Sequence, residues 1–428
     1  MSHPRVAVGL SAAGIGLLVL VGASAPNENT LKAPVSPFRL PAITGAVSAV
    51  MTCVAIVLST AGLVGMLRAH DRGWSPSPRR LMCVGAGAAL VVANLTPVGS
   101  SDMASYAAYG RIAALGGDPY VVSPAQLGDG YVGLVSTTWL HTPSVYGPVA
   151  TWWQEAAAWI GGHRQWLTIW LLMLANAVVF IGSGYLLIRT AEDRVRAGLM
   201  WVANPVLIVV LAAGGHLDTI VAGVTVCAVA VARRAMRTGR ASHDVCVGLL
   251  VGLACGIKIS AALLGVGLIW PLLRTGAWIR AAWQVGAAAA TLVLLYACYG
   301  LHALGPLTAA SHLVSAPSLW QGFNHVGSMV VGRQASATAT TVLWPMLMLV
   351  LAPALHRHIP PASAPVVAVP LALSLAWILA APWSMPWYTG IAWALAAMAV
   401  QGPADWLLIA ATSTLTLFHN SGGHGWTW

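Results

Sequence analysis

The chain has 428 residues, of which 58% are hydrophobic and only 7% are charged. Soluble domains carry about 25% charged residues, so this composition excludes an ordinary soluble fold and predicts one large integral membrane domain. The formal net charge is +10, but the basic residues lie in short clusters between apolar runs. Such clusters follow the positive-inside rule, and we expect a lipid bilayer rather than a nucleic acid as the partner.

The six cysteines lie in or at the ends of apolar runs, and no two of them form a CxxC pair. This placement predicts neither a disulfide framework nor a zinc site. We therefore expect no metal ion and no cofactor.

The first apolar run, 6–24, overlaps the sequence Ala23-Ser24-Ala25, which resembles a signal-peptidase site. A cleaved signal sequence and a retained first helix are both open, and we favour the retained helix. Either alternative leaves the orientation of the following segments unchanged.

A helix needs about 20 apolar residues to span a membrane. On this criterion the sequence predicts an all-α polytopic membrane protein, with about thirteen transmembrane helices in a single domain over 1–428. The predicted spans are 6–24, 42–66, 81–97, 165–188, 197–213, 218–233, 245–257, 260–273, 281–300, 340–354, 364–381, 387–400 and 404–418.

The basic clusters set the predicted orientation. When the thirteen spans alternate, fifteen of the 21 Lys and Arg residues fall on one face, which must be cytoplasmic. We therefore expect the N-terminus inside, the C-terminus outside, and a multi-pass location in the plasma membrane. Two long segments, 98–164 and 301–339, then lie on the extracytoplasmic face. The cytoplasmic loops are short and carry no Gly-rich phosphate-binding sequence, which argues against a cytoplasmic nucleotide donor.

Asp102 follows an apolar run at the start of the first long segment, in a chain with only 11 Asp and Glu residues. A carboxylate at the mouth of a membrane helix is costly unless it faces water, a partner or a substrate. Two interpretations stay open. Asp102 is either a general base whose partial burial raises its basicity, or the N-cap of the helix that follows, and one residue can serve both roles.

The sequence Gly116-Gly117-Asp118-Pro119-Tyr120 indicates a helix end followed by a turn, because Gly ends helices and Pro prevents their restart. Asp118 is still a candidate for a cavity. His216 and Asp218 lie between two predicted spans. They can pair, contact a polar headgroup or hold a cation, or Asp218 can cap the next helix.

Lys258 lies between two apolar runs, where a lysine needs an anionic partner. That partner is either a lipid phosphate or an acid of the chain such as Asp218, and Arg333 and Arg111 are weaker candidates for the phosphate. The aromatic segment 382–388 is either an interfacial belt or a surface that stacks on a sugar ring or packs against a polyprenyl chain.

Together these sequences resemble the polytopic GT-C glycosyltransferases that use polyprenyl-phosphate sugars, and above all the actinobacterial polyprenyl-phosphomannose-dependent α-1,6-mannosyltransferases. Where that family often has His-Asn-Asp, this chain has His216-Leu217-Asp218, which puts any role of an amide there in doubt. The resemblance rests on Ser101–Arg111, Gly117–Tyr120, Tyr146-Gly147-Pro148, Asn204-Pro205, Gly215–Asp218, Lys258 and Pro386-Trp387-Tyr388.

The resemblance implies a GT-C-like fold and inverting transfer of a sugar, above all mannose, from a polyprenyl-phosphate donor. The implied acceptor is a hydroxyl of a glycolipid or lipoglycan. Asp102 takes the place of the catalytic acid of the first loop, and Lys258, with His325 or Arg333, would bind the donor phosphate. The expected substrate-binding residues are Asp118, Tyr120, Tyr146, His216, Asp218, Trp387 and Tyr388.

A transporter or flippase for a lipid or a small solute is the main alternative, because it shares the spanning helices and the intramembrane charges. Transporters often contain inverted repeats, and this sequence shows no internal repeat of fixed period. The two long external segments favour an enzyme.

Overall fold

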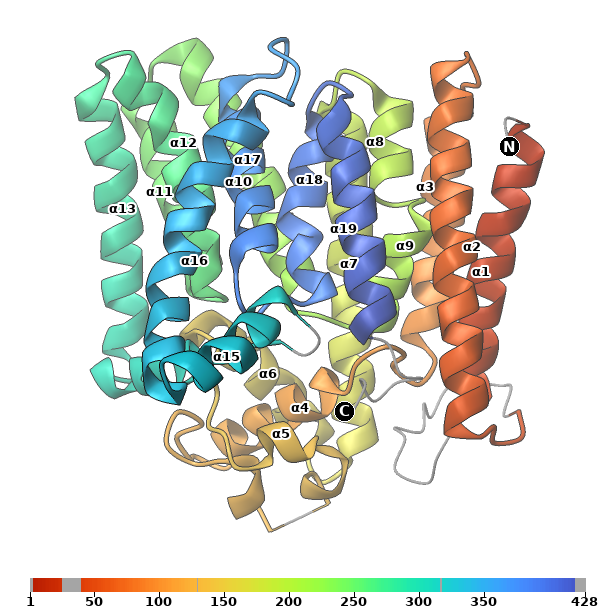
Figure 1. Cartoon of the computed structure of the whole chain (residues 1–428), viewed down its shortest axis with the longest axis vertical. Helices are drawn as coiled ribbons and strands as arrows, with labels where there is room; N and C mark the ends of the chain where they lie inside the picture. The colour runs from red at the N-terminus through yellow and green to blue at the C-terminus, as the bar shows by residue number, and fades with distance from the viewer. Residues whose placement is uncertain (1–2, 25–39, 129, 316–317, 420–428) are drawn as a thin grey trace.

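The structure is a computed structural model that describes residues 3–24, 40–128, 130–315 and 318–419. Every regular element in these ranges is a helix, and the helices form one bundle (Figure 1). The prediction of an all-helical fold is therefore confirmed for the described residues.

Within the described residues, seven helical segments are both long enough and apolar enough to cross a bilayer. One of them, Arg194–Ala213, is broken into two helices and a π-helical turn. The seven are α1 (Pro4–Ser24), α2 (Gly45–Asp71), α7 (Gln165–Thr190), α8 with α9 and η3 (Arg194–Met200, Pro205–Leu207 and Ile208–Ala213), α10 (Asp218–Thr238), α13 (Trp278–Ala297) and α16 (Arg333–His356).

Shorter helices complete the bundle. Each of the thirteen predicted spans lies largely on helix, but in the part of the chain that the structure describes only seven helical segments combine the length and the hydropathy of a crossing. The number of crossings and the side of each terminus therefore stay predictions. The shorter helices are α3 (Pro78–Ala93), α11 (Ala241–Cys255), η4 with α12 (Ile259–Ala261 and Ala262–Arg274), α17 (Pro365–Ala380), α18 (Gly390–Met398) and α19 (Pro403–His419).

The two long predicted loops contain helices of their own. Figure 1 shows α4, α5 and α6 together at the lower end of the bundle, with α15 beside them. The spanning helix α16 begins inside the second of these ranges, so the last residues of 301–339 are part of it. The elements of the two segments are α4 (Asp102–Ala114), η1 (Pro124–Gln126), η2 (Val132–Leu134), α5 (Thr137–Leu140), α6 (Pro148–Gly161), η5 (Leu301–Leu304), α14 (Gly305–Ala310) and α15 (Leu319–Val330). Outside them, the short helix η6 (Pro386–Thr389) comes directly before α18.

Helices α1 and α2 pack through small residues, as helices in a bilayer commonly do. A Cβ on Gly14 or on Gly62 would collide with the facing helix, so both glycines allow the close approach. This packing gives the predicted first helix a place in the bundle. Ala25, the last residue of the predicted signal-peptidase sequence, lies outside the described residues.

The broken segment of α8, α9 and η3 lies at the centre of the bundle, where nearly all of its residues are buried. Asn204 starts α9, because its side-chain oxygen accepts hydrogen bonds from the amides of Val206 and Leu207. Pro205 then occupies the first helical position, where its missing N–H costs nothing. The segment ends at Ala213, three residues before His216, and so leads into the turn that carries this histidine.

Candidate active site

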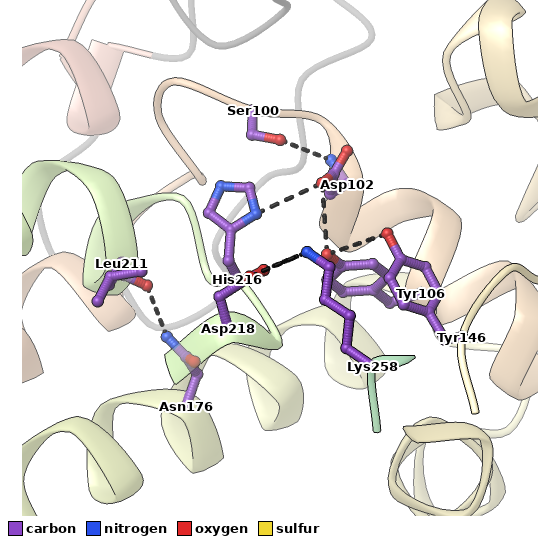
Figure 2. Close-up of polar contacts among 9 residues, drawn as sticks. All are labelled: Ser100, Asp102, Tyr106, Tyr146, Asn176, Leu211, His216, Asp218 and Lys258. Carbon is purple, nitrogen blue, oxygen red and sulfur yellow. Dashed lines mark hydrogen bonds and ion pairs between the residues drawn. The ribbon is translucent and has the colours of Figure 1, made fainter. Parts of the chain in front are cut away.

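Asp102 is the first residue of α4, and its carboxylate points into a cluster of polar side chains (Figure 2). Its Oδ2 lies 3.4 Å from Nδ1 of His216 and accepts a hydrogen bond of 3.3 Å from the hydroxyl of Tyr106. The backbone N–H of Asp102 donates to the hydroxyl of Ser100 at 3.1 Å. Because both partners of the carboxylate are side chains rather than amides of α4, the geometry favours a chemical role over an N-cap.

The surroundings of Asp102 keep its carboxyl ionised. Burial acts to raise the pKa of Asp102, but the hydrogen bond and charge of His216, with the charges of His419 and Lys258, outweigh burial and hold the pKa below its ordinary value. The expectation that partial burial raises the basicity of this residue is therefore wrong, because it left out the neighbouring positive charges. The side chain is still 14% exposed, so a substrate hydroxyl can reach it.

His216 is held in place by its backbone and by a ring partner. Gly215 has a φ of +68°, and a Cβ there would collide with Met103 and Met173, so this position requires glycine. The imidazole then stacks on Trp387, with 3.7 Å between ring centres and 10° between planes. A buried, stacked ring has little freedom to rotate, and its Nδ1 stays directed at Asp102.

Asn176 on α7 supports the π-helical turn that leads to His216. Its Nδ2 donates a hydrogen bond of 2.8 Å to the carbonyl oxygen of Leu211, within η3 (Figure 2). Such turns occur frequently at functional sites, because they shift the residues that follow. The sequence interpretation missed Asn176, although an amide inside an apolar run was a usable signal.

Lys258 and Asp218 form an ion pair beside Asp102. The ammonium group lies 2.9 Å and 3.0 Å from the two carboxylate oxygens of Asp218, and 3.5 Å from the centre of the Tyr388 ring. Lys258 is 14% exposed and Asp218 is 6% exposed. Of the two partners considered for Lys258, the geometry gives it the acid of the chain, and a bound phosphate would have to share the ammonium group with Asp218.

The Tyr146-Gly147-Pro148 sequence joins this cluster from α6. The amide of Gly147 donates to the carbonyl of Ile257 at 3.0 Å, which fixes the start of α6 against the residue before Lys258. The hydroxyl of Tyr146 lies 3.5 Å from that of Tyr106, and the two rings meet edge to face with 5.2 Å between their centres. The sequence interpretation did not single out Tyr106 as a site residue, although it lies one helical turn after Asp102.

The aromatic segment η6 also contributes to the cluster. Trp387 is buried on His216, and Tyr388 lies over Lys258 while its ring stacks on Trp377 with 5.2 Å between centres. These contacts place both aromatics in the polar cluster, whereas one of the two interpretations of the sequence assigned them to an interfacial belt. A narrow crevice opens next to His216 and is lined by Val98, Gly99, Val209, Val210, His216, Pro386, Trp387 and Thr416.

Asp118 and Tyr120 lie beyond the other end of α4, a helix of 13 residues that is about 20 Å long. Asp118 contacts His302 through Oδ2 at 2.6 Å, and its Oδ1 accepts from the amide of Tyr120 at 2.9 Å. The hydroxyl of Tyr120 lies 2.8 Å from that of Thr151. These contacts form a second cluster, apart from Asp102. A role of Asp118 and Tyr120 in substrate binding stays a prediction.

The two other predicted phosphate ligands lie on the second long segment. His325 is exposed on α15, and Arg333 is exposed at the first residue of α16. The structure gives neither side chain a contact with Asp102 or Lys258 within the described ranges. Their role in phosphate binding stays a prediction. The same described ranges contain no group of three His, Cys, Asp or Glu side chains that could hold a metal ion.

The helical bundle, with seven candidate spans among the described residues, and the cluster around the Asp102 carboxylate define a polytopic membrane protein with one main candidate active site. The chain belongs to a mannosyltransferase family, because residues 6–274 match the family model of the alpha-(1→6)-mannopyranosyltransferase N-terminal domain. The matched range includes Asp102, His216, Asp218 and Lys258, whereas the aromatic segment η6 lies outside it.

Two mycobacterial proteins are similar to part of the chain. A probable alpha-(1→6)-mannopyranosyltransferase of Mycolicibacterium smegmatis is 34% identical over 137 residues, which are 30% of this chain and 24% of the relative. An alpha-(1→6)-mannopyranosyltransferase of Mycobacterium tuberculosis is 32% identical over 150 residues, 33% of this chain and 25% of the relative. The aligned segments thus span about a quarter of each relative's length.

Proposed function

We propose that this protein transfers a mannosyl group from a polyprenyl-phosphate donor to a hydroxyl of a glycolipid or lipoglycan, at the extracytoplasmic face of the plasma membrane. The observation that supports this proposal most strongly is the state of Asp102: its carboxylate is partly exposed, is kept ionised by a lowered pKa, and lies 3.4 Å from His216. Family membership and the names of the two relatives support mannose as the sugar. The loops predicted to be cytoplasmic are short and contain no nucleotide-binding sequence, which supports a lipid-borne donor.

In the proposed reaction the acceptor oxygen attacks C1 of the donor sugar from the face opposite the phosphate. The C1–O bond to the phosphate breaks, its electron pair leaves with the lipid phosphate, and the acceptor proton passes to Asp102. A β-linked donor then gives an α product. The phosphate is already a good leaving group, so the reaction needs a base and positive charge rather than a strong general acid. Lys258 supplies that charge once the phosphate competes with Asp218 for its ammonium group.

The lowered pKa of Asp102 fits this order of events. A carboxylate that is ionised at neutral pH is always ready to accept a proton, but it is too weak to deprotonate a free sugar hydroxyl in advance. The proton therefore moves as the new C–O bond forms and the acceptor oxygen becomes acidic. General-base catalysis of this kind contributes typically 10²–10⁴-fold to a rate.

The test is transfer in membranes that contain the Asp102→Asn variant, with a panel of labelled polyprenyl-phosphate sugars. We expect transfer to fall by roughly 10²–10⁴-fold, because the amide cannot accept the proton. Asp193→Asn is the matched control, since it removes a carboxylate that pairs with His70, away from the Asp102 cluster. Near-normal turnover by Asp102→Asn would show that Asp102 is not the general base. Transfer from GDP-mannose without a lipid carrier would reject the proposed donor.

A lipid or solute transporter is the second candidate, and the broken segment of α8, α9 and η3 favours it. Transporters place their binding sites at discontinuous helices near the middle of the membrane. The same labelled donors separate the two functions. An enzyme forms a covalently mannosylated acceptor, whereas a transporter moves the donor across sealed vesicles and leaves it chemically unchanged.

A further inference from the structure

Helix α15 combines a neutral sequence with an exposed apolar surface. Its twelve residues include no Asp, Glu, Lys or Arg. Four of its apolar side chains repeat at helical spacing, so they form one stripe along the helix, which we call the α15 stripe. The stripe consists of Leu319 (92% exposed), Phe323 (40%), Val326 (61%) and Val330 (78%).

The other sides of α15 have their own partners or face water. Asn324 points to α16, where its Oδ1 accepts hydrogen bonds from Ser336 at 2.9 Å and Thr340 at 2.7 Å. Gln321 and His325 are exposed on the side opposite the stripe. A short helix with one apolar side and one polar side is the form of helices that lie in a membrane interface.

The α15 stripe continues onto a surface that is itself suited to lipid. Helix α16 is long and apolar enough to cross a bilayer, and only a small share of it is buried in the protein. A surface hollow lies where the chain passes from α15 to α16, and it is lined by Val331 of the link and by Arg333, Val342 and Leu343 of α16, among others. Figure 1 shows α15 lying across the lower end of α16, as expected for a helix at the membrane surface. An exposed apolar patch of this kind marks an interaction site.

Three hydrogen bonds connect α15 and the residues before it to the segment that leads into η6. The indole N–H of Trp320 donates to the carbonyl of Ala380 at 2.7 Å. The amide of Ser315 donates to the carbonyl of Pro382 at 2.8 Å, and the amide of Ser384 donates to the hydroxyl of Ser315 at 3.0 Å. Two residues further along the chain η6 begins at Pro386, and its next two residues are the aromatics that contact His216 and Lys258.

We propose that α15 is a membrane-surface helix whose stripe docks into the lipid beside α16, and that this docking holds the segment 380–384 and the aromatics that follow it in place. The partner is the lipid surface itself. Because α15 carries no formal charge, its docking depends on apolar contact and not on anionic headgroups.

The first experiment measures depth in the membrane. Nitroxide spin labels are attached to Val326→Cys, on the stripe, and to Gln321→Cys, on the opposite side, after the six native cysteines have been replaced by alanine. The full chain is reconstituted in phosphatidylcholine vesicles. We expect the label at position 326 to collide preferentially with dissolved oxygen and the label at 321 with a water-soluble nickel complex, at low and at high salt alike. Water exposure at both positions, or lipid exposure at both, overturns the docking.

The second experiment measures whether docking of the α15 stripe holds the segment 380–384 in place. A water-soluble maleimide reacts with Ser384→Cys in the same background. Adding Val326→Asp should raise the rate several-fold, because a carboxylate expels the stripe from lipid, whereas adding Gln321→Asp should not. Trp320→Phe, which removes the indole donor and keeps the stripe, should also raise the rate and leave the depth of position 326 unchanged. Equal rates in all these variants overturn the link. Neither measurement uses sugar transfer, so the inference stands or falls independently of the proposed function.

Discussion

At Asp102, burial and neighbouring charge act on the same carboxyl in opposite directions. The buried imidazole of His216 is stacked on Trp387, so its Nδ1 is presented to the carboxylate at a fixed angle. This arrangement supports a role for His216 in positioning Asp102, the proposed base, and in keeping it ionised, whereas the contact with substrate expected from the sequence stays a prediction. The distinction can be tested, because a positioning residue changes the pH profile of the reaction.

We expect the acidic limb of the pH–rate profile to lie below the ordinary aspartate range, because only ionised Asp102 accepts a proton and its pKa is lowered. His216→Phe keeps a ring that can stack on Trp387 but removes Nδ1, so the pKa of Asp102 should rise and the limb should move to higher pH. Tyr106→Phe removes a neutral donor and should move the limb less. Profiles of mannosyl transfer in membranes measure both shifts. An unchanged limb in His216→Phe contradicts the assignment.

The Lys258–Asp218 pair separates a structural role from a phosphate-binding one. Removing one partner leaves a buried charge, so Lys258→Met or Asp218→Asn alone should lower the free energy of unfolding by about 3–5 kcal/mol. The double variant leaves neither charge and should recover most of that loss, as a thermal melt in detergent would show. If Lys258 binds the phosphate, the stable double variant still transfers no sugar. If the double variant recovered sugar transfer as well as stability, the Lys258–Asp218 pair would have a structural role and no role in phosphate binding.

Several of the predicted site residues that the structure brings together lie at or next to the ends of helices. His216, Asp218, Lys258 and Tyr388 each lie next to the end of a helix, and these ends meet beside Asp102. Asp118 and Tyr120 belong to the same sequence segment as Asp102, but the length of α4 separates them from it. The sequence therefore predicted several of the polar and aromatic residues that meet in the cluster around Asp102. It did not reveal which of them share a cavity, because that depends on how the helices pack.

At the scale of elements, the apolar runs predicted where helices lie, and the Gly116-Gly117 sequence correctly predicted the end of α4. Two features were missed. The π-helical turn η3 depends on a long-range hydrogen bond from Asn176 that no local pattern reveals. The amphipathic helix α15 was assigned to a loop, because its twelve residues are too few to qualify as a span.

Gly215 is the backbone position on which η3 and His216 depend. Gly215→Ala should cost more than the roughly 1 kcal/mol of a left-handed alanine, because its Cβ also collides with Met103 and Met173. Gly239→Ala is the matched control, since Gly239 has a similar φ of +64° and open space around it. Thermal melts should show a small loss for Gly239→Ala and a larger one for Gly215→Ala, with transfer lost only in the latter. Equal losses would mean that packing around His216 is loose.

At the scale of the whole molecule, paired charges occupy both ends of the bundle. Away from the site, the Arg196 guanidinium is buried against Asp405 at 2.7 Å and against the carbonyl oxygen of Ala396 at 2.6 Å. Arg280 makes two hydrogen bonds to the buried carboxylate of Asp244. Two of the fifteen arginines that set the predicted orientation are thus also structural, and the orientation depends on the remaining, mostly exposed ones.

The orientation itself can be tested with two exposed positions from opposite sides of the predicted membrane. Val121, 62% exposed between α4 and α6, lies in the first long segment, and Arg240 is exposed between α10 and α11. In a cysteine-free chain, we expect a membrane-impermeant maleimide to label Val121→Cys in intact cells and to label Arg240→Cys only after permeabilisation. The reverse pattern would put Asp102 on the cytoplasmic side, where nucleotide sugars are available. A lipid-borne donor would then lose its main support, while the geometry of the base would stand.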